Sequence, residues 1–233
     1  KQVKGASTTI FEIKYLGDGE RQLILKNKAP PIDVEDIPNL LEARVVHIAP
    51  IVNEVSYGAV DKLRGLSNFV SLDPQGFLRK FDKNGYTRLQ RMENPRVLER
   101  IDLFKSSQRE IEAVTGESDL VHAIRRVHGY GVRLIIVTKG QEGSLLYAKG
   151  RLYRVPAATP KVVVDTTGAG DVLIGAFLAE YTKEKEPLWC ACVGSASASF
   201  VVEKMGPMGF GSKRQVYERA AQVYENTLVA NVT

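Results

Sequence analysis

The sequence predicts an α/β fold in which helices cover both faces of a parallel sheet. Two observations support this. Apolar runs of strand length alternate with helical stretches through most of the chain, and polar loops rich in glycine or serine follow the apolar runs. Ligands of such sheets bind at the carboxyl ends of the strands, so these loops are the candidate functional segments.

The chain opens with a segment that does not fit this alternation. TTIFEIKYL (8–16) and RQLILK (21–26), separated by GDGE, predict a β-hairpin with a glycine-rich turn. We assign residues 1–30 to a small β lid and residues 31–233 to the α/β core. The free edge of such a hairpin is also a candidate dimer contact.

The core elements follow from hydrophobic periodicity and from glycine and proline stops. They are expected in this order: a short helix leading into a buried strand in 39–51, a helix in 54–65, a strand and turn in 69–76, a short strand and helix start in 86–101, a strand, loop and helix in 102–116, a helix in 120–132, a strand and a hairpin in 133–157, a strand in 161–167, and helices in 169–184, 187–206 and 212–229.

Composition narrows the class of protein. The chain is 44% hydrophobic and 25% charged, which fits a globular domain with a sizeable core. The net charge of +5 is scattered, so it indicates a solvated surface rather than a nucleic-acid partner. Cys190 and Cys192 lie on one predicted helix and point apart, and the histidines show no metal spacing. No apolar run approaches the length of a membrane span, so we expect no membrane partner and a cytoplasmic location.

The strongest local signal is VVVDTTGAGDVLIGAF (162–177). Gly168, Ala169 and Gly170 allow a tight turn that exposes backbone N–H groups together. The helix that starts near Asp171 adds unpaired donors and a partial positive charge, so the turn predicts an anion hole for phosphate. A carboxylate at Asp171 can accept the proton of a substrate hydroxyl while the hole holds the phosphoryl group, as phosphoryl transfer to an alcohol requires.

Two familiar glycine motifs are excluded here. No lysine follows Gly170, as a P-loop requires, and Gly175 has the wrong spacing for a dinucleotide fingerprint. A simpler alternative is that Asp171 only caps its helix beside a glycine turn.

A second carboxylate, Asp73 in SLDPQGFLR, ends a predicted strand. Its position predicts either a turn or a contact near the phosphates, with Arg79 as an anion partner.

DTTGAGDVLIGAF resembles the C-terminal signature of the ribokinase (PfkB) family of carbohydrate and nucleoside kinases. Three other stretches support the resemblance in the right order. VTKGQEG (137–143) resembles the family's nucleotide loop, SSQRE resembles its N-x-x-E element, and VGSASASFVVEKMG resembles its adenine-side helix. The opening hairpin resembles the family's lid. The resemblance implies a ribokinase-like three-layer fold whose core binds a nucleotide.

The resemblance also implies roles for matching positions. Asp171 becomes the catalytic base, and the N–H groups of Gly168, Ala169 and Gly170 become the phosphoryl-stabilising hole. The implied nucleotide-binding residues are Ser107, Thr138, Lys139, Gly140, Gly143 and Ser195. Glu110 would organise Mg²⁺ through water. The implied monovalent-cation ring, for an ion such as K⁺, is Asp165, Thr167, Val201, Lys204 and Gly206.

The departures from the family pattern keep alternatives open. Ser107 stands where asparagine is usual, and the family's opening strand, with its substrate-binding aspartate and glycine pair, is missing. We therefore expect an ATP- and Mg²⁺-dependent kinase acting on a sugar, polyol or nucleoside, whose sequence lacks the N-terminal segment. The alternatives are a non-catalytic nucleotide-binding member and a hydroxymethylpyrimidine- or pyridoxal-type kinase; the latter often carries cysteine where Asp171 stands.

Overall fold

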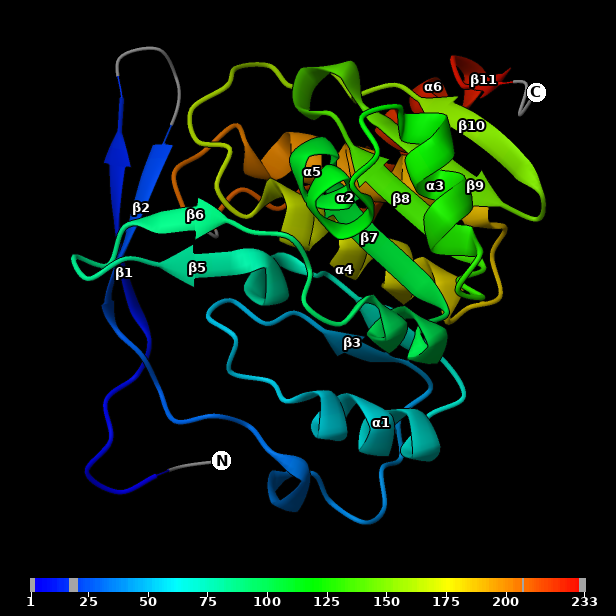
Figure 1. Cartoon of the computed structure of the whole chain (residues 1–233). Helices are drawn as coiled ribbons and strands as arrows, with labels where there is room; N and C mark the ends of the chain where they lie inside the picture. The colour runs from blue at the N-terminus through cyan, green and yellow to red at the C-terminus, as the bar shows by residue number, and fades with distance from the viewer. Residues whose placement is uncertain (1–2, 17–20, 207, 231–233) are drawn as a thin grey trace. The chain divides into compact units, whose positions relative to one another are not determined.

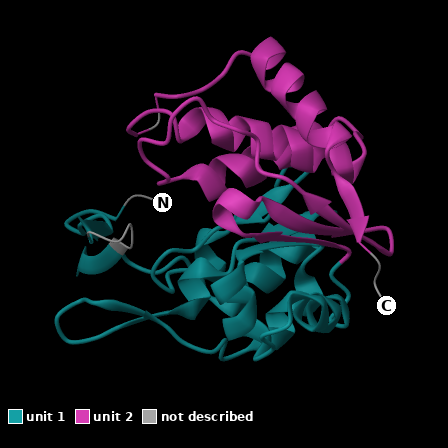
Figure 2. Ribbon diagram, turned by 90° about the horizontal axis from the view of Figure 1, so that it is seen from above, with its two compact units in different colours: residues 1–132 teal, residues 133–233 magenta. Residues whose placement is uncertain are grey.

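A computed structural model describes residues 3–16, 21–206 and 208–230 of the chain. The chain divides into two compact units, residues 1–132 and 133–233 (Figure 2). The core strands are parallel in the first unit and antiparallel in the second. The expected parallel pairing is found in the first unit, and the hairpin expected in 133–157 is found among the antiparallel strands of the second. The proposed division into a lid over 1–30 and a core over 31–233 stays a prediction.

In its described residues, the first unit holds three parallel strands and three α-helices (Figure 1). Strand β4 lies between β3 and β7, with Ile48 opposite Leu72 and Leu72 opposite Phe104. Every residue of β4 is buried, so this strand forms the centre of the unit's core. The bounds are β3 Val46–Ile48, β4 Val70–Leu72, β7 Leu103–Ser107, α1 Tyr57–Leu66, α2 Gln108–Thr115 and α3 Leu120–His128.

The described residues of the first unit also form two antiparallel hairpins. The expected hairpin is confirmed as β1 (Ile10–Tyr15) and β2 (Arg21–Asn27), while its GDGE turn lies outside the described residues. A second hairpin, β5 (Arg79–Phe81) and β6 (Thr87–Leu89), was not expected. The two hairpins lie side by side in Figure 1, and the N–H of Leu25 donates to the carbonyl of Gly85 at 2.8 Å.

The described part of the second unit consists of antiparallel strands and three α-helices. Neighbouring strands pair as β8–β9, β9–β10 and β10–β11. Helices α4 and α5 pack closely, because a Cβ at Gly194 would lie 2.7 Å from the carbonyl oxygen of Leu173. The bounds are β8 Leu134–Thr138, β9 Ser144–Ala148, β10 Arg151–Val155, β11 Leu228–Ala230, α4 Ala169–Tyr181, α5 Pro187–Val201 and α6 Lys213–Glu225.

Among the described residues, four short 3-10 helices lie in the connections. They are η1 Val34–Asp36, η2 Gln75–Leu78, η3 Pro95–Arg100 and η4 Gly140–Glu142. The helix start expected near residue 95 is the short η3, and the helix expected before β3 does not form. Strand β7 runs directly into α2, without the expected loop, because Ser107 caps the helix.

The strand expected in 161–167 is also absent. The N–H groups of Val164 and Asp165 donate to the carbonyl of Val202, at the end of α5, at 2.8 and 3.3 Å. In a strand, these two N–H groups would donate to a neighbouring strand. Because they donate to Val202 instead, this apolar, β-branched run forms no strand ladder. The last helix ends at Glu225, and 228–230 form β11 instead of a further helical turn.

The two cysteines, Cys190 and Cys192, are free and buried on α5. Burial raises the pKa of Cys190 to about 12 and that of Cys192 to about 11, so neither thiol is a nucleophile near neutral pH. Within the described part of the chain, no helix combines the length and apolar character needed to cross a membrane.

Candidate active site

The DTTGAGD turn has the geometry of a helix start with free donors. Gly168 is the N-cap of α4 with φ 80°, a left-handed conformation that favours glycine. Within the turn, the N–H of Ala169 donates to Thr166 O at 3.3 Å. The N–H groups of Gly170 and Asp171 have no acceptor among the residues that the structure describes. Two donors at the positive end of the α4 dipole are therefore available to an anion.

Asp171 lies in the first turn of α4, and its side chain is exposed. Its carboxylate makes no hydrogen bond or ion pair with any described residue, and α4 has no side-chain cap. The alternative of a simple capping aspartate predicts such a bond. The carboxylate is instead uncommitted beside the free donors, which is the arrangement a base for a hydroxyl needs.

The glycine loop after β8 is a tight turn closed by its own backbone. The N–H of Lys139 donates to the carbonyl of Gly143 at 2.8 Å, and the N–H of Gly143 donates to the carbonyl of Gly140 at 3.1 Å. Lys139 forms an ion pair with Glu142 at 2.5 Å. Thr138 is the last residue of β8 and pairs with Ser144. The shape of the loop is therefore set by its backbone hydrogen bonds, and the side chain of Lys139 is held in an ion pair.

Gly143 and Ser195 converge on the same segment, residues 155–158. A Cβ at Gly143 would lie 2.2 Å from the carbonyl oxygen of Val155. The Ser195 hydroxyl donates to Pro156 O at 3.1 Å and accepts from the N–H of Ala158 at 2.9 Å. Ser195 is buried, so in this structure it holds the segment beside the glycine loop.

Gly143→Ala should destabilise the chain much more than Gly140→Ala. Both glycines have positive φ, 88° and 60°, but only Gly143 faces backbone atoms within 3 Å. We expect Gly140→Ala to cost about 1–2 kcal/mol from left-handed strain alone, and Gly143→Ala about 3 kcal/mol or more from strain plus overlap. Urea unfolding of both variants measures the difference, and equal losses would contradict the close contact.

Ser107 and Glu110 form a capping box at the start of α2 in the first unit. Glu110 Oε2 accepts from the N–H and the hydroxyl of Ser107, both at 2.7 Å. The remaining oxygen, Oε1, has no hydrogen-bond partner within the described ranges, so it suits a water molecule of a hydrated Mg²⁺. Among the described residues no cluster of three or more acidic, histidine or cysteine side chains could hold a metal ion. A protein-only metal cage is therefore not part of the described site.

A buried ion pair in the first unit was missed by the sequence analysis. Asp73 follows β4 and Lys105 lies in β7, one register position beyond the last paired residues, and Lys105 Nζ is 2.6 Å from Asp73 Oδ2. Both residues are at most 6% exposed. Asp73 Oδ1 also accepts the N–H of Gln75 at 3.1 Å, which confirms the predicted turn. Parallel strand pairing is the signal that could have suggested this pair.

Arg79, expected as an anion partner, has other contacts. It donates to the carbonyl of Ile51 at 3.1 Å, and its guanidinium lies 5.4 Å from the ring centre of Phe11.

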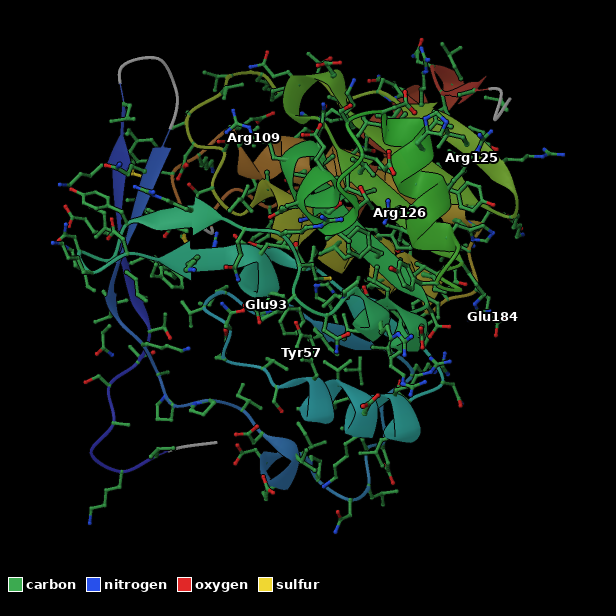
Figure 3. The ribbon with its side chains drawn as sticks, viewed as in Figure 1. Tyr57, Glu93, Arg109, Arg125, Arg126 and Glu184 are labelled. Carbon is green, nitrogen blue, oxygen red and sulfur yellow. The ribbon has the colours of Figure 1, made fainter. Side chains whose placement is uncertain are left out.

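Tyr57, which opens α1, lies near Glu93 (Figure 3). Burial and the charge of Glu93 raise the pKa of Tyr57, against a backbone hydrogen bond at Asn94 that lowers it. The Tyr57 hydroxyl therefore stays protonated at neutral pH.

The implied monovalent-cation residues lie around the end of α5 and the turn. Asp165 Oδ1 accepts the N–H of Thr167 at 2.9 Å, and Gly206 has φ 66°. The N–H of Lys204 donates to the carbonyl of Val201 at 3.2 Å. A cation ring at these positions stays a prediction.

Comparison with known proteins identifies the family. The model of the pfkB family of carbohydrate kinases matches residues 18–213, and the chain belongs to this family. It is 31% identical to a cytidine kinase of Thermococcus kodakarensis over 71% of this chain and 58% of that protein. It is 28% identical to an inositol 3-kinase of Oryza sativa subsp. japonica over 92% of this chain and 56% of that protein. The chain thus spans less than 60% of these curated relatives.

Solved structures confirm the ribokinase-like α/β fold. A pyrophosphate-dependent kinase of the ribokinase family, solved with sulfate, matches with a TM-score of 0.77 and 27% identity, over 91% of this chain and 74% of that one. The nucleoside kinase of Methanocaldococcus jannaschii matches with a TM-score of 0.71 and 25% identity, over 94% of this chain and 70% of that one.

Proposed function

We infer that this chain provides the donor side and the catalytic base of a small-molecule kinase. The reaction moves the γ-phosphoryl group of ATP to a hydroxyl of a sugar, polyol or nucleoside. The observation that carries the proposal is the uncommitted Asp171 carboxylate next to the free N–H groups of Gly170 and Asp171 at the start of α4. Membership of the pfkB family supports the same reaction class.

Each part of the turn has one task in this mechanism. Asp171 accepts the proton of the attacking hydroxyl, and the hydroxyl oxygen forms the new bond to phosphorus as the bond to the ADP oxygen breaks. The N–H groups of Gly170 and Asp171 donate to the transferring group, where negative charge must be stabilised, while the N–H of Ala169 closes the turn on Thr166. The left-handed Gly168 fixes base and donors on one helix end, so their geometry is set before substrate binds.

The nucleotide and ion contacts extend the proposal to other loops. Thr138, Lys139, Gly140 and Gly143 shape the loop for the nucleotide, and Ser195 supports that loop through residues 156–158. Ser107 would approach the nucleotide, and Glu110 would hold a water of Mg²⁺ through Oε1. Bound Mg²⁺ would neutralise charge on the donor phosphates. Asp165, Thr167 and Gly206 would contact K⁺.

The polyol arm of the proposal has its own support. A relative matched over 92% of this chain is named an inositol 3-kinase, and a structural relative was solved with myo-inositol and a pyrophosphate analogue. Inositol therefore belongs among the acceptors, and pyrophosphate among the donors, that are offered to the protein. A cytoplasmic location and a homodimer through the β1–β2 hairpin are parts of the same proposal.

ADP release tests the proposed function. This chain and the product of its complete gene are incubated with Mg·ATP and a panel of sugars, polyols and nucleosides, with phosphate release from pyrophosphate followed in parallel. Turnover with one acceptor class is the expected result. Binding of Mg·ATP without turnover by either protein would favour the non-catalytic alternative. Absence of both binding and turnover would overturn the proposal.

A further inference from the structure

The backbone that leads into the glycine turn is held by hydrogen bonds rather than by burial. The valine side chains at 162–164 are 52–55% exposed, so packing does little to hold residues 161–165. The backbone of this segment is hydrogen-bonded to the end of α5, because the N–H groups of Val164 and Asp165 both donate to Val202 O. The course of this segment therefore depends on the residues just beyond α5.

The next residue along, Glu203, makes the third attachment. Its Oε1 accepts the N–H of Lys161 at 2.9 Å and also an N–H of Arg219 at 3.0 Å. The side chains of Arg219 and Glu203 are only 14% and 15% exposed. A pair this far from solvent keeps its geometry better than a surface ion pair does.

Arg219 is itself fixed from three sides. Its guanidinium carbon lies 3.6 Å from the centre of the Phe200 ring, and its Nη1 donates to the Ser199 hydroxyl at 2.7 Å. Gly211 packs against the Phe200 ring, and a Cβ at this position would lie only 2.7 Å from the ring. The cation, the ring and the ion pair therefore position the Glu203 carboxylate on the side that faces Lys161.

From this anchor a continuous path of bonds leads to the anion hole. Asp165 is bonded to Val202 and accepts from the N–H of Thr167 through its side chain, and Thr166 accepts from the N–H of Ala169. Ala169 is the first residue of α4. A shift of the segment at 161–165 must therefore move the first turn of α4, where the free donors are.

We propose that Glu203 and Arg219 are positioning residues for the phosphoryl-transfer site. Neither contacts the reacting groups; together they hold the 161–165 segment and so aim the N–H groups of Gly170 and Asp171 at the bound phosphate. This role rests on the proposed function of the turn. The pair acts through backbone geometry, so its loss must be visible in the turn itself as well as in ligand affinity.

Three variants of the 233-residue chain test the proposal. Glu203→Gln keeps an acceptor for Lys161 but removes the charge that holds Arg219, Arg219→Met removes the cation but keeps bulk over Phe200, and Arg219→Lys restores the charge. Glu186→Gln is the matched control, because it breaks an exposed pair with Lys149 at the other end of α5. The readouts are Mg·ATP affinity by calorimetry, the amide NMR resonances of residues 168–171, and the thermal midpoint.

We expect Glu203→Gln and Arg219→Met to weaken Mg·ATP binding about tenfold and to move the 168–171 resonances, as loss of well-aimed donors to a charged group implies. Arg219→Lys should recover most of the affinity, and the control should change neither readout. Unchanged affinity, or a loss that follows the thermal midpoint with unmoved resonances, would overturn the proposal. If the unaltered chain binds no Mg·ATP, the proposed function fails, and the resonances alone decide: moved signals support positioning and unmoved signals overturn it.

Discussion

Asp171→Asn should lower kcat by about 10²–10⁴-fold, the usual contribution of a general base. The amide has nearly the same shape and keeps the first turn of α4 intact, but it cannot accept the proton of the acceptor hydroxyl. Mg·ATP affinity should change little, because the exposed carboxylate has no bond to any described residue that its loss could break. Steady-state kinetics on the active protein, with calorimetry for Mg·ATP, separate the two effects.

The control for Asp171→Asn is Asp171→Glu, which keeps the charge at the helix start but moves the carboxylate by one methylene. We expect activity between that of the unaltered protein and that of the Asn variant. If Asp171 served only the helix dipole, Asp171→Asn would cost about 0.3–1 kcal/mol of stability and leave kcat unchanged. That outcome would remove the base from the proposed mechanism.

Lys105→Met should be among the most destabilising single substitutions, because it leaves the Asp73 carboxylate buried without its cation. Breaking a buried pair in this way costs about 3–5 kcal/mol. The partner is 2.6 Å away, and both side chains are at most 8% exposed. The double variant Asp73→Asn/Lys105→Met removes both charges and keeps an acceptor for the N–H of Gln75, so it should be more stable than the single variant.

Urea unfolding of the two single variants and the double variant gives the coupling between Asp73 and Lys105. The control is Arg126→Met, which breaks an exposed pair with Glu117 at 2.9 Å and should cost at most about 1 kcal/mol. Equal losses for Lys105→Met and Arg126→Met would show that the carboxylate of Asp73 finds another partner or reaches water.

Short-range patterns in the sequence predicted much of this fold. The β1–β2 hairpin, the start of α4 and the helices α1, α3 and α5 all follow from apolar spacing and from glycine within a few residues. The elements that were mispredicted depend on distant partners. The valine run at 162–164 reads as a strand, yet its donors bond to Val202, and β11 forms only because β10 offers an edge.

The candidate site divides in the same way. The sequence by itself determined the glycine turn and the position of Asp171 at the start of α4, because these depend on the conformational freedom of adjacent residues. Only the tertiary structure decided that Lys105 pairs with Asp73, that Ser195 holds residues 156–158, and that Arg219 fixes Glu203. Those contacts join residues 16 to 39 positions apart. No local periodicity encodes them; strand register and helix packing do.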